Sequence, residues 1–193
     1  MDEKDNWKPE YLAINPNGQV PAMQIEHPNG DKITLIQSIA IIQYLEETYP
    51  DLPKLLPTEP VARAKIRAIA DVIASGIQPL QNLGPLEKVK ELGFDSIEWG
   101  RYFIERGFKG LEAMLTETAG KYCYGDKITL ADVCLVPQVY NANRFHVDMS
   151  QFPVISRIEQ LLLTHEAFAS SHPSNQVDFP GAKDPTMVHE LLK

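Results

Sequence analysis

Cysteine and long apolar runs are both scarce in this sequence. Cys123 and Cys134 are its two cysteines, and they lack the spacing of metal ligands. Both lie in apolar segments, so we expect small buried side chains in a reducing compartment and no metal site. No apolar run approaches the ~18 residues of a membrane span, and the N-terminal MDEKDNWKPE lacks the basic start and apolar stretch of a secretory signal. We therefore expect a cytoplasmic protein without a membrane segment.

Positive charge is also in short supply. Lys and Arg number 18 against 26 Asp and Glu, giving a formal net charge of −8, and the basic residues are scattered along the chain. Nucleic acid is therefore not an expected partner, because it is bound by concentrated positive charge. Apolar residues make up 44% and charged residues 23%, a composition typical of folded globular chains.

The N-terminal part of the chain combines signals of loop, strand and helix. The segments VPAMQIE (20–26) and KITLI (32–36) are rich in residues that favour strands, and the turn sequence HPNGD lies between them, which predicts a β-hairpin. Residues 38–49 carry apolar side chains at helical spacing and are followed by Pro50, which cannot continue a helix. These patterns predict one hairpin and one helix.

A hairpin with a single helix removes too little apolar surface from water to offset the loss of chain entropy. We therefore expect part of this domain to be missing before Met1. The patterns together predict a partial α/β domain over residues 1–55, an all-helical domain over residues 58–180 and a flexible tail over residues 181–193.

The helical part begins after a candidate cap at Thr58, and Pro60 suits the first turn of a long helix that we expect to be distorted near Pro79. A second helix is predicted to begin near Ser96. Its expected apolar face consists of Trp99, Phe103, Phe108, Leu111 and Leu115.

A third helix is predicted at Thr129, where Thr129 and Asp132 have the spacing of a capping box. The residues that follow Asp132 are almost wholly apolar, so this helix is expected to run through the centre of the domain. Residues 153–163 predict a further helix, and residues 179–193 a mobile tail.

Two short motifs of the N-terminal part suit ligand binding. Gln37-Ser38 lies between a predicted strand and helix, where a hydroxyl and free amides favour a carboxylate; the alternative is that Ser38 only caps the helix. Val20-Pro21 opens a predicted strand, and a cis bond there would turn the Val20 backbone outward to pair with an extended peptide. The alternative for Val20-Pro21 is a stiff loop end.

Polar residues surround the predicted helix break at Pro79 and the end of the helix that starts at Thr129. Two interpretations of these polar residues are open: they line a cleft, or they form solvated surface. These residues are Gln78, Gln81, Asn82, Asn141, Asn143 and Arg144.

Four segments, in chain order, carry a family resemblance: NPNGQVPAM, ITLIQSIAIIQYLEETYP, GIQPLQNLGPL and GDKITLADVCLVPQVYNANRF. Over about residues 10–180 the chain resembles the zeta class of glutathione transferases, the maleylacetoacetate isomerases. The Gln-Ser pair and the Thr-x-x-Asp box are common to glutathione transferases in general, whereas GIQPLQN and CLVPQVYNANRF select this class. The resemblance implies an N-terminally truncated thioredoxin-like domain followed by an all-helical C-terminal domain, and a homodimer.

The resemblance also implies glutathione as the cofactor. Val20 with Pro21 would hold the cysteinyl backbone of glutathione, and Gln37 with Ser38 its γ-glutamyl end. From the helical domain, Gln78 and residues 82–84, beginning with Asn82, would approach the same ligand. Arg144 would lie near a small anionic diketo-acid substrate.

The family's catalytic segment, Ser-Ser-Cys with a nearby Arg, does not occur in the printed sequence, so no catalytic residue is assigned. Ser170-Ser171 is followed by His172 and Pro173 near the C-terminal end and cannot replace it. The function implied by the resemblance is glutathione-dependent isomerisation of maleylacetoacetate to fumarylacetoacetate in tyrosine and phenylalanine catabolism.

The absence of the thiol-activating segment predicts no measurable turnover for these 193 residues alone and little retention on immobilised glutathione. Two alternatives remain open at this point. One is glutathione conjugation or α-haloacid dehalogenation, which share the thiolate step. The other is a non-enzymatic dimerisation module.

Overall fold

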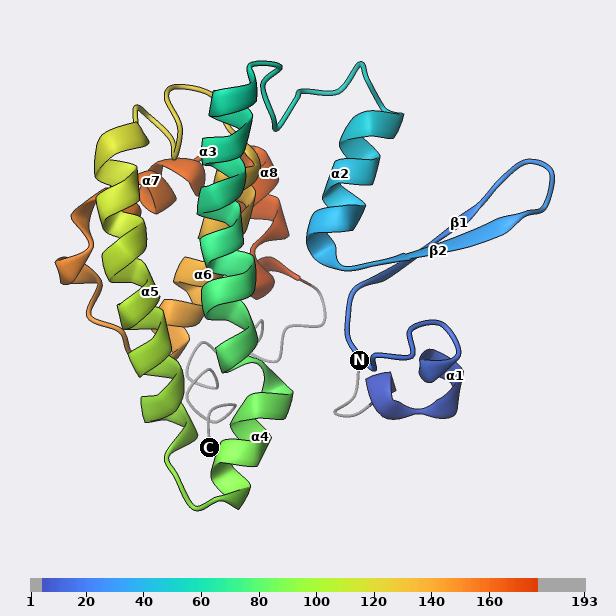
Figure 1. The fold of residues 1–193 in the computed structure, drawn as a ribbon, viewed down its shortest axis with the longest axis horizontal. Coiled ribbons are helices and arrows are strands. Elements are labelled where there is room, and N and C mark those ends of the chain that lie inside the picture. The colour runs from blue at the N-terminus through green and yellow to red at the C-terminus, as the bar shows by residue number, and fades with distance from the viewer. Residues whose placement is uncertain (1–4, 177–193) are drawn as a thin grey trace. The chain divides into compact units, whose positions relative to one another are not determined.

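The computed structural model describes residues 5–176, and the chain divides into two compact units, Met1–Lys54 and Leu55–Lys193. Figure 1 shows the elements of each unit. The predicted tail over residues 179–193 lies outside the described residues.

The first unit contains the predicted hairpin and helix. The elements of this unit are η1 (Asp5–Trp7), α1 (Pro9–Leu12), β1 (Ala22–Glu26), β2 (Lys32–Ile36) and α2 (Ser38–Thr48). The two strands are antiparallel, with Ala22 opposite Ile36 and Glu26 opposite Lys32. In the turn, the His27 amide donates to Asp31 O at 2.8 Å, and Gly30 takes a left-handed φ of 87°, which glycine adopts without strain. The predicted hairpin is confirmed.

Helix α2 packs on β2 and ends before Pro50, as predicted. Its buried residue is Ile41, which is the only buried apolar side chain among the described residues of this unit. The first unit is therefore thinly packed.

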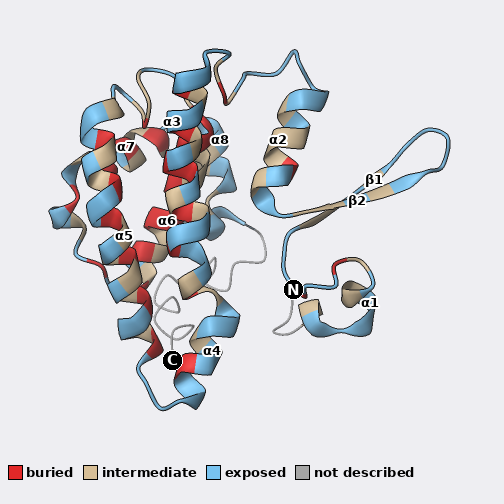
Figure 2. Cartoon of the chain, in the orientation of Figure 1, coloured by how far each residue is buried: buried red, intermediate tan, exposed pale blue. Residues whose placement is uncertain are grey.

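The second unit is helical. Its elements are α3 (Pro60–Asp71), η2 (Val72–Ile77), η3 (Gln78–Gln81), α4 (Leu83–Glu91), α5 (Ser96–Thr118), α6 (Leu130–Arg144), η4 (Met149–Gln151), α7 (Pro153–Leu162), α8 (Glu166–Ser171) and η5 (Pro173–Asn175). Helix α3 packs on α6, and α7 packs on both α5 and α6. Figure 2 shows that the buried residues gather along the facing sides of these helices.

The cap of α3 differs from the prediction. Glu59, not Thr58, precedes the helix, and its carboxylate accepts hydrogen bonds from Val61 N at 2.8 Å and Ala62 N at 2.6 Å. Pro60 occupies the first turn, as predicted. The long Glu59 side chain folds back onto both free amides, a role usually filled by shorter side chains.

The predicted distortion of this helix is confirmed, but it begins before Pro79. The backbone widens into a π-helix over Val72–Ile77 and then tightens into a 3₁₀-helix over Gln78–Gln81. Helix α4 follows, with the Asn82 side chain accepting from Leu83 N at 2.8 Å. Three helical geometries thus meet within a short stretch of chain.

Helix α5 starts at Ser96, as predicted, after Asp95 caps it. The prediction for its apolar face is partly wrong, because Ile104 is fully buried whereas Trp99 and Phe103 are only partly covered. Phe108 packs edge-on against Phe152 with 5.4 Å between ring centroids.

The capping box predicted at the start of α6 is present. Asp132 Oδ2 accepts from Thr129 N at 2.7 Å and from Thr129 Oγ1 at 2.8 Å, while Asp132 Oδ1 accepts from Cys123 N at 2.9 Å. The carboxylate is fully buried, so all of its bonds are internal.

Helix α7 covers the predicted residues to within one position, and its cap comes from another helix. Glu112 of α5 accepts from Val154 N at 2.7 Å and from Ile155 N at 3.0 Å.

Among the described residues, none of the helices combines the length and the apolar character that a bilayer crossing requires.

Candidate functional site

Val20 lies at the end of a well-anchored loop. The loop is held by Asn15, which is buried and donates to Gln19 O, and by Tyr11, whose hydroxyl donates to the same carbonyl at 2.8 Å. The Val20-Pro21 peptide bond is cis, and Val20 is 60% exposed. The strand ladder begins at Ala22, so the Val20 backbone lies beyond it. A loop held by two side-chain hydrogen bonds thus leads to an exposed residue whose backbone lies outside the ladder.

Gln37 and Ser38 join β2 to α2, and both are exposed. Gln37 is the residue that precedes the helix, and it has a left-handed φ of 72°, an uncommon conformation for a side chain other than glycine. Ser38 is the first helical residue, and the Gln37 side chain makes no capping bond. The Ser38 hydroxyl therefore stands beside helix N-terminal amides, which lack intrahelical partners and favour an anion.

The alternative interpretation, in which Ser38 serves only as the cap, disagrees with this placement because Gln37 occupies the capping position. Hairpin register also brings the two motifs together. Ala22, which follows Pro21, pairs with Ile36, which precedes Gln37. Both motifs therefore lie at the same end of the hairpin.

The three predicted residues of the helical unit occupy two places. Gln78 is the first residue of η3 and is exposed, and Asn82 is half-buried between η3 and α4. Arg144 ends α6, where its Nη1 donates to Asn141 Oδ1 at 3.3 Å and its guanidinium lies 5.9 Å from the centroid of the Tyr140 ring. Gly84 has open space where a side chain would begin.

Gln81 corrects a prediction. Its place beside Pro79 predicts either a cleft-lining or a solvated residue, but Gln81 is buried and its side chain bonds to Gln138. Gln138 received no assignment from the sequence, because a glutamine in an apolar helix has no local pattern that identifies its partner.

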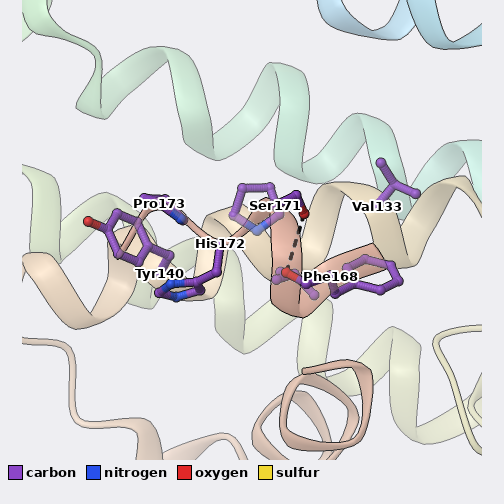
Figure 3. A pocket seen from close by; sticks show the side chains of 8 residues that line it. Val133, Tyr140, Phe168, Ser171, His172 and Pro173 are labelled. Atoms are coloured by element: carbon purple, nitrogen blue, oxygen red, sulfur yellow. Dashed lines mark hydrogen bonds between the residues drawn. The ribbon is translucent and has the colours of Figure 1, made fainter. Parts of the chain in front are cut away.

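A small pocket of about 170 Å³ lies between α6, α8 and η5 (Figure 3). Its lining consists of Val133, Val136, Pro137, Tyr140, Phe168, Ser171, His172 and Pro173. The His172 ring meets Tyr140 edge-on. The Ser171 hydroxyl, whose shorter bond is to Ala167 O at 2.7 Å, also lies 3.3 Å from Phe168 O (Figure 3). None of the predicted site residues lines this pocket.

Ser170 and Ser171 lie at the end of α8, and both hydroxyls donate to Ala167 O. Both hydroxyls therefore lie at the C-terminal end of a helix and not beside its free N-terminal amides.

Both cysteines are free, and neither is a candidate nucleophile. Burial, together with the Asp132 carboxylate, raises the pKa of Cys123 far above its ordinary value. Burial and the carboxylates of Asp71 and Asp132 raise the pKa of Cys134 to about 12. Both thiols are thus protonated at neutral pH. The part of the chain that the structure describes also contains no cluster of three His, Cys, Asp or Glu side chains suited to a metal ion.

Comparison with known proteins gives consistent likenesses. Residues 2–48 match the family described as Glutathione S-transferase, N-terminal domain. The chain is 50% identical to a maleylacetoacetate isomerase of Mus musculus over 179 residues, which are 93% of this chain and 79% of the relative. It is 53% identical to a probable maleylacetoacetate isomerase of Drosophila melanogaster over 171 residues, 89% of this chain and 72% of the relative.

Solved structures are similar as well. A maleylacetoacetate isomerase from Anaeromyxobacter dehalogenans, with glutathione bound in its active site, superposes with a TM-score of 0.82 at 40% identity, covering 89% of this chain and 79% of that one. A maleylpyruvate isomerase described as a bacterial glutathione S-transferase of the zeta class gives a TM-score of 0.82 at 37% identity, covering 90% and 82%.

Proposed function

Because the chain belongs to the maleylacetoacetate isomerase family of glutathione transferases, we propose that its function is the glutathione-dependent isomerisation of maleylacetoacetate to fumarylacetoacetate. The observation that carries this proposal is the 50% identity to the mouse isomerase over 93% of the chain. The predicted fold class is confirmed: a thioredoxin-like glutathione transferase N-terminal domain followed by a helical domain.

Glutathione would bind at the end of the hairpin where both motifs lie. Val20 is exposed and its backbone lies outside the ladder, so this backbone would pair with the cysteinyl part of the tripeptide as an added strand does. The γ-glutamyl carboxylate would accept from the Ser38 hydroxyl and the first amides of α2, with Gln37 beside it. This part of the chain fits an extended peptide with an anionic end.

In the helical unit, Gln78 and Asn82 would contact glutathione, and Arg144 would bind a carboxylate of the diketo acid. The Arg144 guanidinium retains donors beyond the one bonded to Asn141, because it has five N–H groups.

Glutathione, when bound, supplies the thiol that adds to the cis double bond and departs after rotation. The residues named above bind and orient it, and none of them activates the thiol.

Glutathione binding is tested by titration calorimetry on the protein and on Gln37→Ala and Ser38→Ala. Loss of hydrogen bonds to a carboxylate, worth about 1.5–3 kcal/mol each, predicts affinity lowered about tenfold or more. Gln24→Ala is the matched control, since Gln24 is an exposed glutamine on β1. Absence of binding, or equal weakening by the control, would contradict the proposal.

The reaction is tested by following fumarylacetoacetate formation at saturating glutathione. None of the residues assigned above activates the thiol, so we expect the 193 residues alone to bind glutathione weakly and to give no measurable turnover. Turnover would reveal a thiol-activating group among them. If the protein shows catalytic turnover, Arg144→Ala should raise the KM for maleylacetoacetate, whereas Arg101→Ala, on α5, should not. Fumarylacetoacetate formation that does not require glutathione would overturn the assignment.

We further propose a cytoplasmic homodimer that acts in tyrosine and phenylalanine catabolism. Support for an interface comes from apolar side chains that the helical unit leaves exposed, including Val61 on α3 at 60% and Tyr102 on α5 at 57%. Sedimentation analysis should give twice the chain mass of 21.7 kDa. A monomer at micromolar concentration would contradict the homodimer.

A further inference from the structure

Two buried glutamine side chains join η3 to α6. Gln81 is 6% exposed and Gln138 is 2% exposed, and Gln81 Nε2 donates to Gln138 Oε1 at 2.9 Å. Gln81 Oε1 and Gln138 Nε2 are buried without a hydrogen-bond partner among the described residues. Exchanging oxygen and nitrogen in both amides reverses the bond and still leaves one donor and one acceptor unpaired.

Stability alone does not account for such a pair. Replacing both partners of a buried hydrogen bond by apolar groups of the same shape is often neutral or stabilising, so we expect two apolar side chains of similar volume to pack here at equal or lower free energy. A single hydrogen bond between two side-chain amides instead fixes the orientation of one helix relative to the other, since it requires the two residues to face each other.

The segment around Gln81 needs such a constraint. It lies where a π-helix, a 3₁₀-helix and α4 follow one another, and Pro79 has no N–H to donate to the helix ladder. The backbone N–H of Asn82 donates to Pro79 O over a long distance of 3.5 Å. The local backbone ladder of this segment therefore has one donor missing and one long hydrogen bond.

Contacts with the rest of the helical unit hold this segment in place. Ile77 is fully buried against Gly107, and Trp99 Nε1 donates to Leu80 O at 2.9 Å. Gln81 is the buried residue of η3. Gln78 and Asn82, which lie on either side of Gln81 in the sequence, are the residues of the helical unit that we propose contact glutathione.

We propose that Gln81 and Gln138 are positioning residues whose hydrogen bond sets the rotation of η3 and thereby aims Gln78 and Asn82 at glutathione. Each residue of a 3₁₀-helix turns the chain by about 120°, so a slip of one residue against α6 would redirect both side chains by a third of a turn. This inference rests on the proposed glutathione-binding function.

The principal test is the double variant Gln81→Met/Gln138→Met, which keeps side-chain length and removes both amides. Its melting temperature should equal or exceed that of the unmodified protein, while its dissociation constant for glutathione rises at least threefold. Gln160→Met, on an exposed position of α7, is the control and should alter neither quantity. A double variant with unchanged affinity would overturn the proposal.

A second readout does not require glutathione. In a Trp7→Phe background, Trp99 is the remaining tryptophan, and its indole N–H is bonded to Leu80 O within the segment. Rotation of η3 should break this bond, shift the emission to longer wavelength and increase quenching by acrylamide. An unchanged Trp99 spectrum in the double methionine variant would contradict the proposal even if the unmodified protein bound no glutathione, an outcome that would by itself reject only the proposed function.

Gln138→Glu is the conservative variant. Its carboxyl group still accepts from Gln81 Nε2 through the oxygen in the place of Gln138 Oε1, so the bond between η3 and α6 is kept. We expect the Trp99 spectrum and the glutathione affinity of the unmodified protein, even where the melting temperature falls. If the methionine variant does not fold, this variant decides, because a folded Gln138→Glu protein with altered Trp99 emission would overturn the inference.

Discussion

The carboxylate of Asp132 holds together the start of α6 and the segment before it. Its two oxygens accept from the amides of Thr129 and Cys123 and from the Thr129 hydroxyl, within a fully buried setting. Removing the carboxylate would leave buried amides without partners, and such groups are costly because they have also lost water.

Asp132→Ala is therefore expected to destabilise the protein by about 3 kcal/mol or more. Urea unfolding followed by circular dichroism measures the change. Asp148→Ala is the matched control, since Asp148 also accepts from a backbone amide, that of Ser150, but is exposed; its effect should be much smaller. Similar losses for both variants would show that burial does not set the importance of Asp132.

Helices of the second unit owe their close packing to particular glycines. A Cβ atom at position 107 would lie 2.3 Å from Ile77 Cγ1, whereas one at position 110, a turn later on α5, meets no heavy atom within 4 Å. The same substitution thus has opposite consequences at neighbouring positions of one helix.

Gly107→Ala is expected to destabilise the protein by about 1–3 kcal/mol, because the fully buried Ile77 must move. Gly110→Ala should be neutral or stabilise it by up to about 1 kcal/mol, because alanine favours the helix. Thermal unfolding of the two variants provides the comparison, and equal effects would contradict the packing argument.

The first turns of α3 and α5 depend on exposed carboxylates. Bonds from the amides of Glu98 and Ile97 lower the pKa of Asp95, and bonds from Val61 and Ala62 lower the pKa of Glu59. When the pKa is lower in the folded state, the stabilisation is present above the unfolded-state pKa, near ~4, and is lost as pH falls through the folded-state value.

Stability should accordingly decline as pH falls from about 5 toward 3. Asp95→Asn, whose amide oxygen still accepts the same bonds but does not titrate, should reduce the slope of unfolding free energy against pH. The free energy of unfolding, measured between about pH 5 and pH 3 for both proteins, tests this expectation. An identical slope in the variant would rule out a contribution from Asp95.

At the scale of the whole molecule, buried apolar side chains are unevenly shared. Nearly all buried apolar side chains of the described residues lie in the helical unit, whereas the described part of the first unit contains one, Ile41. Local stability follows buried apolar contacts, so the two units are expected to differ in the free energy of local opening.

Hydrogen exchange should therefore be slowest in α5 and α6 and much faster in β1 and β2. Glutathione should slow exchange at the end of the hairpin, at the amides of Val20 and Ser38, because the ligand would cover them. Exchange followed by mass spectrometry tests both points. Protection of the hairpin equal to that of α6 without ligand would contradict the first.

Local patterns in the sequence predicted most of the elements correctly. The hairpin, α2, the starts of α5 and α6, and the capping box at Thr129 rest on interactions between residues a few positions apart, which the sequence displays directly. The two motifs that meet at the end of the hairpin were also identifiable, because strand register follows from the turn between the strands.

Only the tertiary structure decided which distant groups meet. Glu112 caps α7 from α5, Gln81 pairs with Gln138, and Ile104 replaces Phe103 in the core because packing against neighbouring helices selects the buried side. Partners such as these are separated by tens of residues, and no local periodicity encodes the direction from which a distant helix approaches. The residues that aim the proposed glutathione contacts therefore became visible only in the folded chain.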